Sequence, residues 1–180
     1  QAHFEQSLVE ALKKRERCVI EEKGIRCAVL ALLYFPEDKP FILLIKRTLQ
    51  LPHHKGEISF PGGKREKGDS SLLETALRES HEEIGVSPAE IRTAGCLDDI
   101  IVKTTKFIIT PFVGYIHHPF TMKINHQETE KVLEIPLSFF LEKENHWIEE
   151  LTYKQESFSC HFYQWQDEVI WGATGSTVHN

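Results

Sequence analysis

Apolar residues at the start of the chain recur with the period of an amphipathic helix. The positions at this spacing are Phe4, Leu8, Val9 and Leu12. They predict a helix over residues 3–17 that packs on a core. Two continuous apolar runs follow, "IRCAVLALLYF" at 25–35 and "FILLIKR" at 41–47, separated by the turn-like "PEDKP". Short apolar runs bounded by turn residues are typical of buried strands, so we expect two strands here.

The middle of the chain is predicted to hold a loop, a short strand and a second helix. The loop is "TLQLPHHKGE" at 48–57, and the strand is "ISFPGG" at 58–63, whose glycines allow the backbone to approach a ligand closely. Asp69–Ser71 offers candidate N-cap residues, and Gly85 suits the left-handed position that ends a helix. The helix is therefore expected from about 71 to 84.

The second half of the chain alternates strand-like and helical segments. The expected strands are "IIV" (100–102), "FIITPFVGYI" (107–116) and "EKVLEIPL" (130–137). They are followed by a short helix in "LSFFLEK" (137–143), a hairpin in "ELTYKQESFSCHFYQW" (150–165) and a last helix that begins in "EVIWGATGSTV" (168–178). With no repeat or linker, this mixture predicts one α/β (α+β) domain over residues 1–180, of which 1–24 are the N-terminal helix and lead-in.

The net charge of the chain is −6 at pH 7, and this argues against nonspecific binding to nucleic acid, which requires a basic face. No run of about twenty apolar residues is present that would cross a membrane. We therefore expect a soluble cytoplasmic protein whose partners include neither nucleic acid nor membrane. The sequence does not determine the oligomeric state and leaves a homodimer open. The chain begins without methionine, so it does not bear on a native targeting segment.

Cysteines and histidines suggest no metal site. The cysteines are widely spaced and form no CxxC pair, so we expect reduced structural thiols at Cys18, Cys27, Cys96 and Cys160. The ten histidines include the adjacent pairs His53–His54 and His117–His118. Paired histidines in turns are more often polar surface residues than ligands, so we assign no metal to the histidines.

The helix expected at 71–84 carries three glutamates on one edge. At about 100° per residue, Glu79, Glu82 and Glu83 share an arc of roughly 100° beside the apolar face. Such a group is most often a solvated helix face. Here, however, the acids lie at the negative end of the helix dipole, and only Arg78 is near enough in sequence to neutralise them. Divalent Mg²⁺ or Mn²⁺, which prefer hard oxygen ligands, would compensate this charge.

Residues 63–86, "GKREKGDSSLLETALRESHEEIGV", resemble the Nudix box. In that motif Gly, five residues, Glu and seven residues precede Arg-Glu-aliphatic-any-Glu-Glu-any-Gly-aliphatic. The segment departs from it in two ways: Asp69 replaces Glu with eight residues before Arg78, and Ser80 replaces an aliphatic residue. The resemblance implies the Nudix fold, in which a mixed sheet lies between helices and the box forms a loop-helix-loop.

The departure at Asp69, the longer spacing and "TALRE" at 75–79 are similar to the coenzyme A pyrophosphatase branch of this family. That branch also has a stretch of the form LLxxRS before the box, then Arg, Gly and FPGG. Residues 43–63, "LLIKRTLQLPHHKGEISFPGG", keep Arg47 and the later glycines, whereas Thr48 replaces the Ser and Pro52 the second Arg. Later segments, "TPFVG", "EKVLEIPL" and "IWGATGS", extend the resemblance over about residues 25–176.

The resemblance implies metal-dependent hydrolysis of a diphosphate in a small nucleotide derivative, most directly coenzyme A or its derivatives to 3′,5′-ADP and 4′-phosphopantetheine. The implied ligands of Mg²⁺ or Mn²⁺ are Glu79, Glu82, Glu83 and the carbonyl of Gly63. Arg78 would orient Glu82 or another box carboxylate through a charge-assisted hydrogen bond. Glu79 is the first candidate for the general base, and Glu128, in an expected loop, is the second.

Cations before the box are candidates for binding the substrate phosphates. Arg47 lies in the motif and Lys55 follows it, while Lys46 is a weaker candidate that is about as often a surface residue. The peptide dipoles of Gly62 and Gly63 would also suit a phosphate. Pro52 removes a guanidinium that would grip a phosphate, so the expectation of diphosphate hydrolysis rests on more residues than that of coenzyme A specificity.

Two alternatives remain open beside this reading. One is a Nudix hydrolase of another nucleoside diphosphate derivative, such as a dinucleotide or a nucleotide sugar. The other is a non-catalytic ligand-binding Nudix domain, which would lack box acids that are all present here. Phe60 and Trp171 are candidates for contact with a base or pantetheine, although large aromatic residues near glycine more often pack in the core.

Overall fold

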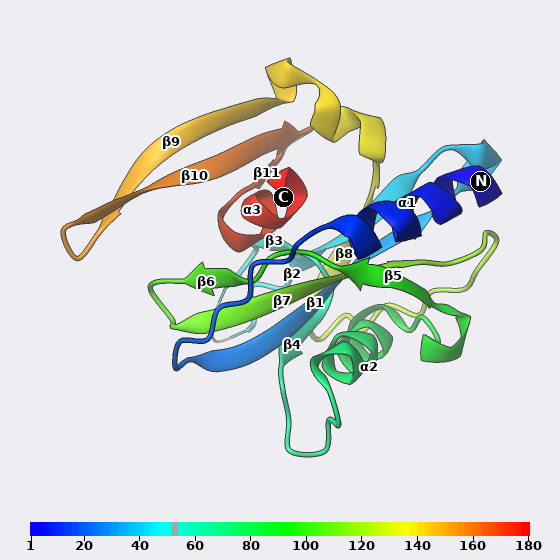
Figure 1. The fold of residues 1–180 in the computed structure, drawn as a ribbon, viewed down its shortest axis with the longest axis horizontal. Coiled ribbons are helices and arrows are strands. Elements are labelled where there is room, and N and C mark those ends of the chain that lie inside the picture. Colours follow the sequence, from blue (N-terminus) through cyan, green and yellow to red (C-terminus); the bar gives the residue numbers. More distant parts are fainter. Residues whose placement is uncertain (52–53) are drawn as a thin grey trace.

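The computed structural model describes residues 1–51 and 54–180, and Figure 1 shows the arrangement of its elements. The helices are α1 (Ala2–Lys14), α2 (Leu72–Ile84) and α3 (Gly172–His179). The strands are β1 (Ile25–Tyr34), β2 (Phe41–Arg47), β3 (Ile58–Ser59), β4 (Gly62–Lys64), β5 (Arg92–Cys96), β6 (Ile100–Val102), β7 (Phe107–Tyr115), β8 (Thr129–Pro136), β9 (His146–Tyr153), β10 (Glu156–Trp165) and β11 (Glu168–Ile170). Short 3₁₀ segments are η1 (Pro36–Asp38), η2 (Pro88–Glu90), η3 (Leu137–Leu141) and η4 (Lys143–Asn145).

The central sheet is mixed. Strand β1 pairs in parallel with β7 and antiparallel with β2, and the path β3-β2-β1-β7-β5 is extended by β4 on β1, β6 on β7 and β8 on β2. A second, antiparallel sheet has the order β11-β10-β9. The expected α+β class, with a mixed sheet between helices, is confirmed.

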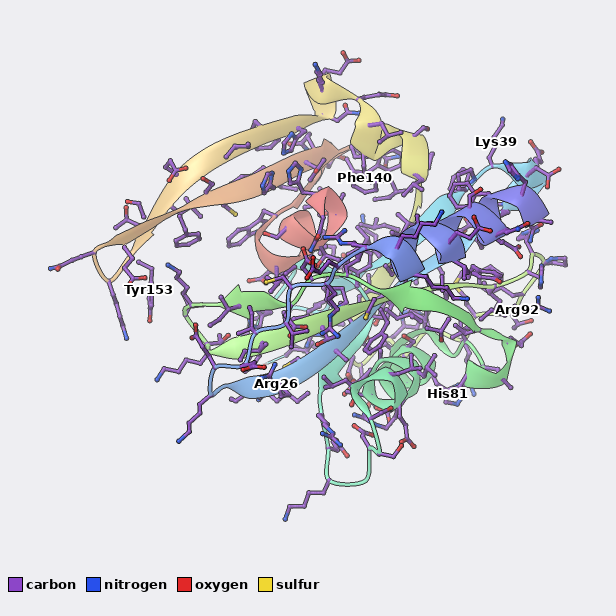
Figure 2. All side chains as sticks on the ribbon, in the orientation of Figure 1. Arg26, Lys39, His81, Arg92, Phe140 and Tyr153 are labelled. Carbon is purple, nitrogen blue, oxygen red and sulfur yellow. The ribbon has the colours of Figure 1, made fainter. Side chains whose placement is uncertain are left out.

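Both faces of β1 are covered, which explains why its sequence is continuously apolar. Ala28, Leu30 and Leu32 pack in the cluster shared with α2. Ala31 and Leu33 belong to the opposite cluster, against which α1 and the strands of the second sheet pack. Figure 1 shows α2 on one side of the central sheet and α1, α3 and the β9–β10 hairpin on the other. Side chains fill the space between these layers, and Phe140 packs against the cluster that contains Ala31 and Leu33 (Figure 2).

Both ends of α2 lie where the sequence predicts them. Ser71 is the N-cap, and its hydroxyl accepts a hydrogen bond from the Glu74 backbone N–H at 3.1 Å. Gly85 ends the helix with φ 71°. The segment at 123–125 then donates backbone N–H groups to the carbonyls of Ile84 (2.8 Å) and Glu83 (3.0 Å), so the last turn of α2 is capped by a distant part of the chain.

Three segments differ from the expectation. Strand β5, "RTAGC", has no apolar run to mark it and exists because it pairs with β7. Residues 168–170, expected to begin the last helix, instead pair with β10 as β11, and the helix starts only at Gly172. The helix expected at 137–143 is the 3₁₀ segment η3. All four cysteines are unpaired; Cys27 and Cys160 are buried, Cys96 is partly buried and Cys18 is exposed. In the part of the chain described, no helix has the length and apolar character that a membrane crossing requires.

The buried carboxylate of Asp99 connects the segment that follows α1 to strand β7 of the central sheet. Asp99, whose side chain is 1% exposed, forms an ion pair with Arg17 and accepts hydrogen bonds from the Thr110 hydroxyl at 2.7 Å and the Ile20 backbone N–H at 3.0 Å. Burial alone would raise the pKa of Asp99, but these donors outweigh it and hold the pKa below its ordinary value. The carboxylate is therefore ionised in the folded protein at neutral pH.

We predict that Asp99→Asn lowers the free energy of unfolding by about 2 kcal/mol at pH 7, because an amide of the same size loses the charge-assisted bonds. Since the folded pKa is lower than the unfolded one, this stabilisation is present above about pH 4 and disappears as the pH falls through the folded value. Urea denaturation from pH 7 downward measures it. Asp167→Asn, in the exposed turn before β11, is the matched control. A gap between the two variants that stayed constant down to pH 2 would contradict the assignment.

Candidate active site

The three glutamates on the edge of α2 differ sharply in exposure. The side chain of Glu82 is 50% exposed, that of Glu79 is 16% exposed and that of Glu83 is 1% exposed. The helical spacing correctly places them on one edge beside the core. The sequence does not reveal that Glu83 is buried as fully as the neighbouring apolar residue Ile84.

Glu83 is held between α2 and two strands. Its Oε2 accepts the Gly62 backbone N–H at 2.9 Å, and its Oε1 lies 3.3 Å from Nη1 of Arg47 at the end of β2. Burial raises the pKa of Glu83 to about 8, even though the Gly62 N–H and Arg47 lower it. The contacts within the chain thus leave the charge of this carboxylate only partly compensated.

Arg78 is the cation that organises the rest of the acidic edge. Its guanidinium donates to both oxygens of Asp69, at 3.0 and 3.1 Å, and its Nη1 donates to Glu79 Oε1 and Glu82 Oε2, each at 3.0 Å. Asp69 is itself held by the Glu66 backbone N–H, at 2.9 Å. The sequence expectation that Arg78 touches box carboxylates agrees with this geometry. Of the candidate N-caps, Ser71 is the cap, and Asp69 instead binds Arg78.

Gly63 allows strand β4 to lie directly against Glu79. A Cβ at residue 63 would be 2.5 Å from Glu79 Oε1 and 2.6 Å from its carboxyl carbon. Gly63 is opposite Ala28 in the β1–β4 ladder, so the strand cannot easily retreat. Glycine here is therefore needed for the close approach between β4 and the acidic edge.

A fourth carboxylate lies near the edge. Glu128 is in the turn before β8, as its expected loop position requires, and its Oε1 accepts from Asn125 Nδ2 at 3.4 Å. Burial raises the pKa of Glu79, Arg78 lowers it, and the charges of Glu82 and Glu128 raise it again. Glu128 is thus electrostatically coupled to Glu79, which is what a second candidate base requires.

The candidate phosphate-binding cations lie in three different environments. Arg47 is turned toward Glu83, as described, and Lys55 is exposed in the loop that follows β2. Lys46 is engaged elsewhere, because its Nζ is 2.9 Å from Glu168 on β11. Pro52, which occupies the place of an expected phosphate-binding arginine, lies outside the described residues. The Gly62 N–H, expected to face a phosphate, donates to Glu83 here.

The two aromatic candidates differ as well. Phe60 is 2% exposed and packs in the core, as large aromatic residues near glycine usually do. Trp171 is 42% exposed and stacks on Phe162 of β10, with ring centroids 6.0 Å apart.

Sequence reasoning missed the 123–127 segment, which lines a depression of about 560 Å³ beside Glu82. Lys123, Asn125 and His126 are among its lining residues. Its polar residues follow no motif, so only the fold brings them to the site.

The donor set fits a divalent hard cation. Within residues 1–51 and 54–180, Arg47 pairs with Glu83, Arg78 pairs with Glu79 and Glu82, and Glu128 lies near enough to raise the pKa of Glu79. The most buried of these carboxylates, Glu83, has a pKa raised to about 8. Oxygen donors of this kind suit Mg²⁺, Mn²⁺ or Ca²⁺ and are poor ligands for softer ions. The chemistry of these donors therefore agrees with a metal-dependent site at the edge of α2, where Gly63 leaves room for the Glu79 carboxylate.

Comparison with known proteins places this geometry in context. The family model described as the NUDIX domain matches residues 24–165. The chain is 30% identical to the uncharacterized Nudix hydrolase NudL of Photorhabdus laumondii over 86% of this chain and 82% of that protein. It is 30% identical to the peroxisomal coenzyme A diphosphatase NUDT7 of Mus musculus, over 78% of this chain and 59% of that protein. In fold it is similar to the Ap4A hydrolase of C. elegans, with a TM-score of 0.53 at 17% identity, covering 63% of this chain and 81% of that one.

We predict that Gly63→Ala weakens Mn²⁺ binding by about 10- to 100-fold, because the new methyl group must displace the Glu79 carboxylate. The displaced atoms end a flexible side chain, so the urea midpoint should change little. Gly68→Ala is the matched control, since a Cβ there meets nothing within 4 Å. Calorimetric titration with Mn²⁺ measures both variants, and equal affinities would show that Glu79 does not contribute to the metal site.

Proposed function

Because the chain belongs to the Nudix family of hydrolases, we propose that it hydrolyses the diphosphate of coenzyme A or its derivatives, with Mg²⁺ or Mn²⁺, to 3′,5′-ADP and 4′-phosphopantetheine. A Nudix hydrolase acting on a nucleoside diphosphate derivative follows from the family matches. The narrower choice of coenzyme A is supported by one observation above all. Arg47, from the stretch that resembles the coenzyme A branch, lies 3.3 Å from Glu83 of the box, so the two motifs form one site.

The metal ions of this proposal would be held by the carboxylates of Glu79, Glu82 and Glu83, with the Gly63 carbonyl beside them. Bound divalent ions supply charge neutralisation for the diphosphate and lower the pKa of water. The ordering of the carboxylates is the work of the chain itself: Arg78 fixes Glu79 and Glu82, while the Gly62 N–H fixes Glu83.

Glu79 is the proposed general base. Its Oε1 is taken by Arg78 Nη1, whereas Oε2 has no donor among residues 1–51 and 54–180. Oε2 would take the proton of the attacking water as the new O–P bond forms and the bond to the bridging oxygen breaks. Raising the pKa of Glu79 by burial improves its match to a neutral working pH. Glu128 is the second candidate for this role.

Arg47 and Lys55 are proposed to receive the substrate phosphates. Nε of Arg47 is buried and has no partner in the described part of the chain, so this guanidinium has donor capacity beyond its bond to Glu83. Lys55 lies next to Gly56, whose N–H donates to the Arg47 carbonyl at 3.1 Å, so the loop presents both cations at one end of β2. The 3′-phosphate of coenzyme A is a suitable target for the exposed lysine.

The rival within the family is hydrolysis of a dinucleotide or nucleotide sugar. Two relatives in fold carry such names, the Ap4A hydrolase of C. elegans and the NUDIX domain of Shewanella oneidensis NrtR complexed with ADP ribose, and at 17% and 19% identity they show the fold alone. The Ap4A hydrolase is thus a reason to include dinucleotides among the test substrates rather than evidence for them.

We expect purified protein with Mg²⁺ or Mn²⁺ to convert coenzyme A to products with the masses of 3′,5′-ADP and 4′-phosphopantetheine, faster than it cleaves Ap4A, ADP-ribose or a nucleotide sugar. Glu82→Gln, which keeps size and removes charge, should lower turnover by about 100-fold or more. Glu90→Gln, an exposed glutamate in η2, is the control. Full turnover by Glu82→Gln would refute the metal assignment, and equal turnover of all substrates would refute coenzyme A specificity.

We further predict that Lys55→Ala raises KM for coenzyme A by about 2- to 5-fold, the effect of losing one exposed ion pair of about 0.5–1 kcal/mol. KM for 3′-dephospho-coenzyme A and kcat for both substrates should be unchanged. Lys143→Ala, an exposed lysine in η4, is the control. An equal rise in KM for both substrates would show that Lys55 does not contact the 3′-phosphate.

A further inference from the structure

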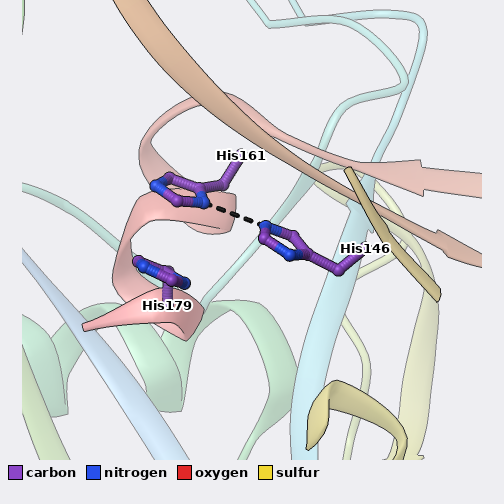
Figure 3. A group of neighbouring side chains, drawn as sticks. All are labelled: His146, His161 and His179. Carbon is purple, nitrogen blue, oxygen red and sulfur yellow. Dashed lines mark hydrogen bonds between the residues drawn. The ribbon is translucent and has the colours of Figure 1, made fainter. Parts of the chain in front are cut away.

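Three histidines converge on the side of the molecule that carries the second sheet. They are His146 on β9, His161 on β10 and His179 at the end of α3, and Figure 3 shows their rings facing one another. A ring nitrogen from each lies within 4.8 Å of those of the other two. His146 Nε2 and His161 Nδ1 are 2.9 Å apart, and the ring centroids of His161 and His179 are 3.8 Å apart.

The backbone, rather than chance side-chain placement, brings these rings together. In the β9–β10 ladder His146 is opposite Tyr163, two residues from His161, so the two histidines are diagonal neighbours on one face. Helix α3 lies directly on this face. The approach is so close that a Cβ at Gly175 would be 2.3 Å from the His161 carbonyl oxygen. His179 is four residues after Gly175 and is therefore on the same side of the helix.

We propose that His146, His161 and His179 form a second metal site, for a borderline transition ion of the Zn²⁺ class, separate from the carboxylate site on α2. Three imidazole ligands leave a fourth position for water or another small ligand, which suits the exposure of His179. Imidazole favours Zn²⁺, Cu²⁺, Ni²⁺ or Co²⁺, whereas Mg²⁺ and Mn²⁺ prefer the oxygen ligands of the other site.

Binding requires only local movement. In a tetrahedral site with Zn–N bonds of about 2.0–2.1 Å, ligand nitrogens are about 3.4 Å apart. Here the nitrogens of His146 and His161 are 2.9 Å apart, and all three ligand nitrogens lie within 4.8 Å of one another. The rings of His161 and His179 are stacked within 19° of parallel, so at least one must rotate about χ2 for both to point at one ion. His179 is exposed and can rotate without disturbing the core. Burial lowers the pKa of both His146 and His161, and this favours the neutral rings that a metal requires.

The site would fasten α3 to the hairpin. The same helix is tied to the central sheet through Thr174, whose hydroxyl donates to the Ile58 carbonyl at 3.0 Å. Ile58 opens the strand segment that leads to Gly62 and Gly63 at the acidic edge. A transition ion at the three histidines would therefore stabilise an element that supports the active-site strand without contributing to the chemistry there.

The test is titration of metal-stripped protein with Co²⁺ and Zn²⁺ in excess Mg²⁺, so that the carboxylate site is occupied by a hard ion. We expect one equivalent of Co²⁺ to give the visible d–d bands of a tetrahedral nitrogen site, Zn²⁺ to abolish them, and Zn²⁺ to raise the melting temperature. His179→Ala, which changes an exposed residue, should weaken Zn²⁺ binding on the order of 100-fold and remove the bands. His161→Gln, with a polar side chain of similar reach, should do the same.

The control is His3→Ala, which removes an exposed histidine from α1 and should leave the bands and the affinity unchanged. Turnover of the proposed substrate with Mg²⁺ is measured in parallel, so loss of the histidine site and loss of the acidic site give different results. Absence of tetrahedral bands in the wild-type protein, or bands that persist in both His179→Ala and His161→Gln, would overturn the proposal.

Discussion

The active-site half of this molecule depends on the burial of one carboxylate. Glu83 is 1% exposed, yet it lies where α2, β2 and β4 meet, and its only partners in the described chain are the Gly62 N–H and Arg47. A buried carboxylate with incomplete compensation is costly to ionise unless further positive charge is close by. That requirement fixes the position of β4 relative to α2 and turns Arg47 inward, so the same contact that joins the elements also prepares a place for a cation.

Arg78 distributes charge over the rest of the edge in a complementary way. It pairs with Asp69, which lies in the loop before the helix, and reaches Glu79 and Glu82 from the same guanidinium. A planar fork suits this arrangement because its donors point in several fixed directions, which the ammonium of a lysine would not provide. The loop, the helix and the carboxylates are thereby held as one unit.

Much of this could be predicted from sequence because local patterns determine it. The apolar run of β1, the N-cap Ser71, the αL residue Gly85 and the spacing of the three glutamates each reflect the geometry of a single element. The contact between Arg47 and Glu83 could not, since it joins residues 36 positions apart, one at the end of β2 and one on α2, which only the tertiary fold brings together. The anchoring role of Asp69 was hidden for a related reason: in sequence it reads as a departure from the motif, and only the fold shows that it binds Arg78. Strands β5 and β11 are too short to carry a pattern and are formed by their neighbours.

The histidine cluster shows where sequence reasoning fails most completely. Its members are separated by 15 and 18 positions, on two strands and a helix, and none belongs to a ligand motif; the adjacent pairs that do attract notice, such as His117–His118, lie elsewhere. Two features bring them together: the diagonal pairing of His146 on β9 with His161 on β10, and the close packing of α3, at Gly175, against the His161 backbone. The oxygen donors on α2 lie on one side of the central sheet, and the imidazole nitrogens between α3 and the β9–β10 hairpin lie on the other. Under the two proposals, imidazole ligands would favour a Zn²⁺-class ion at the histidines, while an excess of Mg²⁺ would occupy the carboxylates of α2.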